Sequence, residues 1–184
     1  MPFYLGWQDL LPIPPDVADA NRIFLLPDPA SKPSDLYTVQ LNRCSVPGYR
    51  FVRYSNPGEI LMFVDGSSLN NGSPNARAGY GVVFAPLEWS SPISGRLEQD
   101  GHPQTSNRAE LRAVLASESL TLRYWAREGS PVANQDLWKK LEGKLREMEK
   151  KGMLVKFWKI PREWNEADEY AKAGAVYFLF FIFE

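Results

Sequence analysis

The sequence predicts an α/β fold, a mixed sheet flanked by helices, and three observations support this prediction. Two segments with helical apolar spacing follow one another, one from about Ser106 and one after Asn134. A third helix is predicted near the C-terminal end. Short apolar runs typical of strands precede and separate the helices, at residues 60–64, 80–84, 153–160 and, more weakly, 93–98.

The two long helices are defined by the spacing of their apolar residues. The first carries Leu111, Val114 and Leu115 at helical intervals. In the second, Asn134 is expected to cap the N-terminus and Gly152 to end the helix. Its apolar face consists of Leu137, Leu141, Leu145 and Met148.

The last helix is predicted from the segment around Asn165. The strand-like run before it breaks at Pro161, because proline has no backbone N–H to donate. Asn165 is a good N-cap residue, and a helix that begins there has Asp168 at its third position.

The two ends of the chain differ from its middle. Residues 1–57 hold 9 of the 15 prolines and show no helix or strand period, so we predict a Pro-rich N-terminal extension that lies on the domain as an extended arm, rather than a separate module. Residues 176–184 form an apolar C-terminal tail. This tail is too short to span a bilayer, which needs ~20 residues, and we expect a packed strand or arm.

Composition indicates a globular protein within the cell. The chain has 184 residues, of which 44% are hydrophobic and 23% charged, and its net charge is −1. There is thus no global basic field of the kind that often marks nucleic-acid binders. The single cysteine, Cys44, cannot form an internal disulfide, and the N-terminus does not resemble a signal peptide. We expect nucleus or cytoplasm, with an organelle left open, and no membrane association.

Two acidic residues occupy sequence positions that suit a metal site. Asp65 ends an apolar run and is followed by Gly66 and Ser67, which predicts a carboxylate at the end of a buried strand. Glu110 falls in the first turn of the helix that begins near Ser106. Buried carboxylates are costly unless they are paired or bind a cation, so the pair suggests a hard-cation site with oxygen ligands.

The chain resembles the type 1 ribonuclease H family, in particular its eukaryotic cellular members. Five motifs of that family occur in order over roughly residues 58–175, which is far more specific than any one of them. They are an Asp-Gly-Ser strand at 65–67, a Gly-Tyr-Gly strand at 79–81, a Thr-x-Asn-Arg-x-Glu helix start at 105–110, a Val-x-Asn-x-Asp-Leu-Trp helix start at 132–138, and Asn-Glu-x-x-Asp in the variant form Asn-Glu-Ala-Asp at 165–168.

The resemblance implies a ribonuclease H-like domain over residues 58–175 and a nuclease that hydrolyses the RNA strand of RNA–DNA hybrids. In that family two Mg²⁺ ions, with Mn²⁺ as a possible substitute, hold the scissile phosphate. Asp65, Glu110 and Asp168 would be the catalytic metal ligands. Each of these acids, taken alone, has the alternative of an exposed carboxylate near a helix N-terminus.

The resemblance also implies a set of substrate contacts. Asn71, Thr105, Ser106 and Asn107 match positions that read the minor groove and the 2′-hydroxyls of the RNA strand. For Thr105 and Ser106, an ordinary role as loop or cap residues is nearly as well supported. The family's flexible-loop histidine has no match: Arg162 and Glu163 occupy that region, and His102, the only histidine, is expected in a solvated loop.

One block of the family pattern is absent. The fourth strand and its acid should follow the first helix, yet there is no Asp between Asp100 and Asp136. We therefore expect an internal deletion that removes the fourth strand. The strand ending near Ile160 would then pair in parallel with the strand of Asp65. The alternative function is a catalytically impaired nucleic-acid-binding protein or a truncated isoform.

Overall fold

A computed structural model describes residues 22–42, 48–117 and 134–176. The chain divides into two compact units, residues 1–31 with 122–161 and residues 32–121 with 162–184. The C-terminal tail predicted for residues 176–184 lies outside the described residues except for Val176. No helix in the described ranges combines the length and apolar character needed to cross a bilayer.

The larger unit begins with a short helix and a three-stranded antiparallel sheet in the order β1-β2-β3. Phe51 and Val52 of the middle strand are buried. This sheet was not expected, because the prolines around it obscure the strand period. Its elements are α2 (Pro33–Leu36), β1 (Tyr37–Asn42), β2 (Gly48–Arg53) and β3 (Asn56–Leu61).

A second antiparallel sheet carries the motif residues. Its strands are β4 (Phe63–Leu69), β5 (Arg77–Val83) and β6 (Ile93–Arg96), in that order, with Asp65 opposite Gly81. The predicted strands at 80–84 and 93–98 are confirmed with shifted ends. The run at 60–64 is divided between β3 and β4. The expectation that Asp65 ends a strand is therefore wrong, since it is the third residue of β4.

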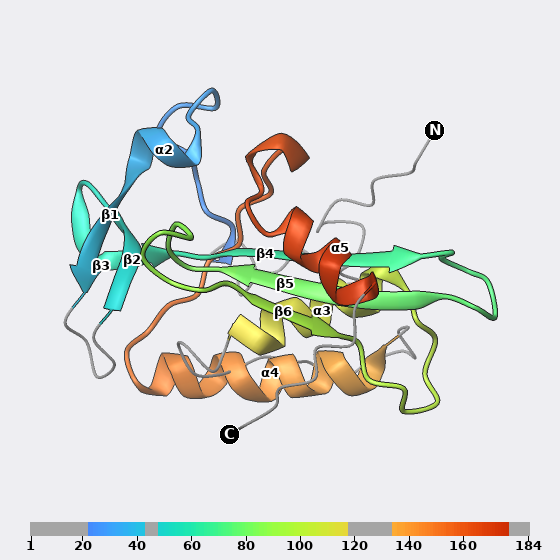
Figure 1. The fold of residues 1–184 in the computed structure, drawn as a ribbon. Coiled ribbons are helices and arrows are strands. Elements are labelled where there is room, and N and C mark those ends of the chain that lie inside the picture. The colour runs from blue at the N-terminus through green and yellow to red at the C-terminus, as the bar shows by residue number, and fades with distance from the viewer. Residues whose placement is uncertain (1–21, 43–47, 118–133, 177–184) are drawn as a thin grey trace, which may run out of the picture. The chain divides into compact units, whose positions relative to one another are not determined.

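The second sheet has a helix on each face (Figure 1). A Cβ atom on Gly66 would lie 2.0 Å from the backbone nitrogen of Glu110, so the backbone of α3 (Ser106–Ser117) rests directly on β4. A Cβ on Gly79 would lie 2.1 Å from the backbone nitrogen of Ala175 in α5 (Asp168–Val176). Because Gly66 is paired with Tyr80, next to Gly79, the two glycines face opposite sides of the sheet.

We expect Gly66→Ala to destabilise the protein by about 3 kcal/mol, because the new methyl group would force α3 away from β4. Gly143→Ala is the matched control. A Cβ at Gly143, on an exposed face of helix α4, meets nothing within 4 Å, and alanine there should stabilise the helix by ~0.5–1 kcal/mol. Urea unfolding of both variants checks this, and equal midpoints would contradict it.

The smaller unit contains the second predicted helix. Helix α4 (Gln135–Lys150) buries Leu137, Leu141, Leu145 and Met148, the apolar face that the spacing predicted. It ends as expected at Gly152, which has φ of 78°. Asn134 does occupy the N-cap position, but its φ is 63° and its side chain makes no capping hydrogen bond.

The strand predicted at 153–160 does not form. Its one bridging residue, Phe157, pairs in parallel with Ile23 rather than with the strand of Asp65. Phe157 N–H donates to the Arg22 carbonyl at 2.6 Å, and Phe24 N–H donates to the Phe157 carbonyl at 2.9 Å. The apolar run of the partner segment is short and is followed by Pro27 and Pro29, which cannot donate ladder hydrogen bonds. Among the described strands, β4 pairs with β5 alone.

Candidate active site

Three different elements supply the three predicted acids. Asp65 is in β4, Glu110 is the fifth residue of α3, and Asp168 is the first residue of α5. Asp168 is therefore two positions nearer the helix start than predicted. The side chain of Asn165 makes the hydrogen bond of an N-cap residue to the second residue after it, although α5 itself begins only at Asp168. Its Nδ2 donates to the Val64 carbonyl at 3.1 Å, and its Oδ1 accepts from the Ala167 N–H at 3.2 Å.

These contacts bring the acids to the same part of the second sheet. The Asn165 hydrogen bond ties the start of α5 to β4 one residue before Asp65. The close approach at Gly66, one residue after Asp65, places the Glu110 backbone against the same strand. The two contacts next to Asp65 thus position both of the other acids.

The carboxylates influence one another electrostatically. Burial raises the pKa of Asp65 to about 6; the charge of Asp168 adds to this increase, while the Gly66 N–H and Arg162 oppose it. Burial likewise raises the pKa of Glu110 to about 7, and the charge of Asp65 contributes. The site therefore concentrates negative charge that the protein itself only partly neutralises.

Two carboxylate oxygens of the site are buried without a hydrogen-bond partner in the described structure. They are Asp65 Oδ2 and Asp168 Oδ1. Asp168 Oδ1 lies 3.2 Å from Arg162 Nε in an ion pair, and Lys172 Nζ donates to the other oxygen of Asp168. Oxygen donors with unused lone pairs and clustered charge fit a hard divalent cation.

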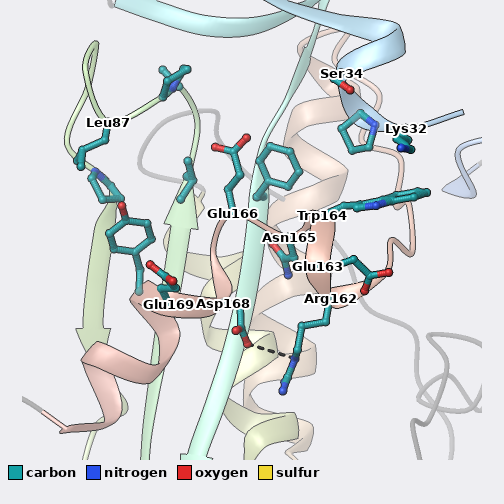
Figure 2. Close-up of a pocket in the computed structure, with 17 residues that line it drawn as sticks. Lys32, Ser34, Leu87, Arg162, Glu163, Trp164, Asn165, Glu166, Asp168 and Glu169 are labelled. Atoms are coloured by element: carbon teal, nitrogen blue, oxygen red, sulfur yellow. Dashed lines mark ion pairs between the residues drawn. The ribbon is translucent and has the colours of Figure 1, made fainter.

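A cavity of about 650 Å³ opens beside these residues in the larger unit. Arg162 and Asp168 lie on its wall, and Trp164 forms another part of the lining (Figure 2). The Lys32 ammonium is 5.8 Å from the centre of the Trp164 ring, within the range of a cation–π contact.

The predicted substrate contacts cluster near the start of α3, with one exception. Thr105 Oγ1 accepts the Arg108 N–H at 3.2 Å, so Thr105 does cap this helix. Ser106 and Asn107 are the first two helical residues and are partly exposed. Asn71 is exposed in the turn that follows β4.

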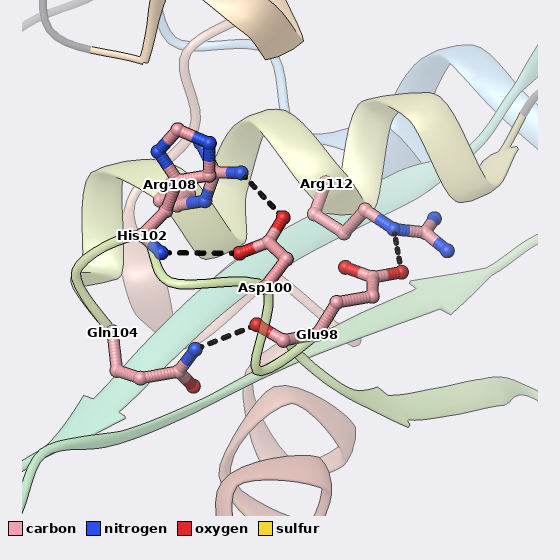
Figure 3. A network of polar contacts seen from close by, with 6 residues as sticks. All are labelled: Glu98, Asp100, His102, Gln104, Arg108 and Arg112. Carbon is pink, nitrogen blue, oxygen red and sulfur yellow. Dashed lines mark hydrogen bonds and ion pairs between the residues drawn. The ribbon is translucent and has the colours of Figure 1, made fainter.

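A polar network holds the segment before α3 in place (Figure 3). Arg108 is 1% exposed and pairs with Asp100 at 3.0 Å, while Gln104 Nε2 donates to the Glu98 carbonyl at 2.8 Å. His102 is exposed in this loop, as predicted. The structural role of Arg108 was missed; its helical spacing from Leu111 and Leu115, three and seven residues on, was the available signal.

The raised pKa values predict a pH dependence of the metal-free protein. The ordinary pKa values of Asp65 and Glu110 are 3.8 and 4.5, and their values in the folded protein are about 6 and about 7. At a pH between the two values of a group, that group binds more protons in the folded state than in the unfolded state. Stability is therefore lost as the pH rises through this window, by on the order of 6 kcal/mol for the two groups together.

Urea unfolding in EDTA between pH 5 and pH 8 measures this loss. Glu110→Gln removes one of the two groups, so its free energy of unfolding should fall less over the same range than that of the unchanged protein. An identical pH dependence in both proteins would contradict the prediction.

Comparison with known proteins gives relatives of one kind. The chain is 41% identical to the ribonuclease H of Schizosaccharomyces pombe over 71 residues, which cover 34% of this chain and 25% of that protein. It is 40% identical to the ribonuclease H of Crithidia fasciculata over 55 residues, 30% of this chain and 11% of that protein. It is 31% identical to the ribonuclease HI of Haemophilus influenzae over 147 residues, 65% of this chain and 91% of that protein. No protein-family model and no solved structure matches the sequence.

The Haemophilus alignment also bears on the expected deletion. Its 147 positions cover 65% of a 184-residue chain, about 120 residues, so about 27 positions have no counterpart in this chain. A strand and a helix together need about that many residues. The total number of unmatched positions is thus of the size of the fourth strand and the element after it.

Proposed function

Because this chain belongs to the ribonuclease H family, we propose that it is a metal-dependent endonuclease that hydrolyses the RNA strand of RNA–DNA hybrids. The observation that supports the proposal is the electrostatic influence between Asp65 and each of Asp168 and Glu110, together with two buried carboxylate oxygens that lack hydrogen-bond partners. Such a set of ligands suits Mg²⁺, with Mn²⁺ as an alternative.

In this proposal the three acids hold the metal, and Asp65 is the central ligand because its charge interacts with both of the others. Two bound Mg²⁺ ions in sites of this kind supply an activated water and stabilisation of the leaving oxygen. Asn165 and Gly66 act indirectly, since their contacts with neighbouring elements keep the carboxylates in position.

Selection of the RNA strand would come from residues beside the acids. We assign Ser106, Asn107 and Asn71 to contacts with the minor groove and the 2′-hydroxyl, the group that distinguishes RNA from DNA. Thr105 joins this set with a restricted role, because its hydroxyl already accepts the Arg108 N–H. It can still donate its own proton to the substrate.

The second candidate is a family member that binds nucleic acid but cleaves poorly. Two observations favour it: about 27 aligned positions of the Haemophilus relative have no counterpart in this chain, and there is no Asp between Asp100 and Asp136. Three carboxylates would then bind a cation without placing both ions that the reaction needs.

One assay separates the two candidates. The purified chain is incubated with Mg²⁺ or Mn²⁺ and a hybrid labelled on each strand, with double-stranded DNA and double-stranded RNA as controls. The proposal predicts metal-dependent cuts in the RNA strand of the hybrid alone. Binding of the hybrid without cleavage in either metal would favour the second candidate, and cleavage of the DNA strand would contradict both.

A further inference from the structure

Arg162 is the residue of interest, because it places a positive charge among the acids. It begins the 3₁₀ turn Arg162–Trp164 that leads into α5. Its Nε lies 3.2 Å from Asp168 Oδ1, and the guanidinium points toward that carboxylate from the preceding segment (Figure 2). The Arg162 side chain is 52% exposed, whereas that of Asp168 is 12% exposed.

The guanidinium acts on all three acids. Besides its ion pair with Asp168, its charge opposes the effect of burial on Asp65 and on Glu110. Lys172 provides a useful contrast. It also pairs with Asp168, at the other oxygen, but it is not among the charges that act on Asp65 or Glu110.

Arg162 and a bound cation would compete for one atom. Asp168 Oδ1 is the buried oxygen that lacks a hydrogen-bond partner, and it is also the oxygen beside Arg162 Nε. A guanidinium keeps its charge in proteins, so it cannot give way by losing a proton and has to move. Its exposed side chain and the adjoining cavity of about 650 Å³ leave it space to do so.

We propose that Arg162 is the resident counter-ion of this site, which neutralises the acids while no metal is bound and leaves Asp168 when a divalent cation binds. The inference rests on the proposed function, because it takes the three acids to be the metal ligands. It adds a residue that sets the affinity for metal, through competition for Asp168 rather than through contact with the substrate.

The proposal predicts tighter metal binding when the competitor is removed. Loss of a unit charge a few ångströms from the carboxylates should lower the dissociation constant for Mn²⁺ at least about tenfold. Arg162→Lys keeps the positive charge and should stay within about threefold of the unchanged protein. Lys172→Ala should have a smaller effect than Arg162→Ala, because Lys172 acts on Asp168 without acting on the other two acids.

The experiment measures Mn²⁺ binding without substrate, from the electron paramagnetic resonance signal of the free ion at pH 8. It compares the unchanged chain with Arg162→Ala, Arg162→Gln, Arg162→Lys and Lys172→Ala. Arg146→Ala is the matched control, since Arg146 is an exposed arginine paired with Glu142 on α4. Equal or weaker Mn²⁺ binding by both uncharged Arg162 variants would overturn the proposal.

Urea unfolding gives a second measurement, which also serves for variants that fold poorly. Without metal the uncharged Arg162 variants should be less stable at pH 8, and Mn²⁺ should raise their urea midpoints more than that of the unchanged protein. Asp65→Asn keeps the two proposals distinguishable. If it binds Mn²⁺ as the unchanged chain does, the metal is elsewhere and the proposed function fails. If it loses binding while the Arg162 variants are unaffected, only the counter-ion proposal fails.

Discussion

Asp65→Asn is expected to reduce cleavage of an RNA–DNA hybrid at least 100-fold while leaving the fold intact. Asparagine keeps the shape of the side chain but removes the charge that interacts with both Glu110 and Asp168. A metal held by the two remaining acids would be misplaced, and a displacement of ~1 Å can cost ~10²-fold in rate.

Single-turnover cleavage with excess enzyme in Mn²⁺ gives the rate of the altered protein, even where turnover is slow. Glu169→Gln is the matched control, because it removes an exposed acid next to Asp168 on the same helix. Cleavage by Asp65→Asn at the rate of the control would exclude Asp65 as a ligand. Circular dichroism of both variants confirms that the comparison concerns folded proteins.

The unchanged chain should itself cleave hybrids at least ~10²-fold more slowly than its Haemophilus relative in Mg²⁺. The resemblance implies four acids, and no Asp lies between Asp100 and Asp136, where the fourth is expected. One fewer carboxylate lowers the negative charge of the site and leaves one ion with too few ligands. Any residual activity should be greater in Mn²⁺, which generally binds such ligands more tightly.

The rates of both proteins in each metal, measured on the same hybrid, check this prediction. A rate in Mg²⁺ equal to that of the Haemophilus relative would show that another acid fills the vacant place. Asp136→Asn is then the first variant to test, because Asp136 is the next Asp along the chain after Asp100.

The helices were predicted well because their signals are local. The apolar spacing of Leu137, Leu141 and Leu145 requires one buried face whatever the rest of the chain does, and α4 buries these residues. Thr105 likewise caps α3 through a hydrogen bond to a residue three positions away. Signals of this range can be recognised in a single sequence.

The strands were predicted less well because their partners lie far along the chain. The run at 153–160 has strand-like residues, but only Phe157 finds a bridging partner, at Ile23. Conversely, β1 and β2 form among prolines because each is the other's partner. Asp65 was placed at a strand end since Gly66 follows it, yet Gly66 continues β4 and allows α3 to approach.

The candidate site was predicted at the level of its motifs, whereas its electrostatics were not. The five motifs indicated Asp65, Glu110 and Asp168. Asp65 lies in the second sheet, and the other two lie on helices that pack against this sheet. The influence of Arg162 on all three acids depends on the path of the turn before α5. Spacing along the sequence carries no information about such an approach.

The location of bound Mn²⁺ tests the central claim most directly. A crystal grown with Mn²⁺ yields an anomalous difference map that identifies the ion and its ligands independently of activity. The account predicts an ion within about 2.5 Å of carboxylate oxygens of Asp65 and of at least one of Glu110 and Asp168. An ion bound elsewhere, with these three carboxylates free at millimolar Mn²⁺, would contradict it.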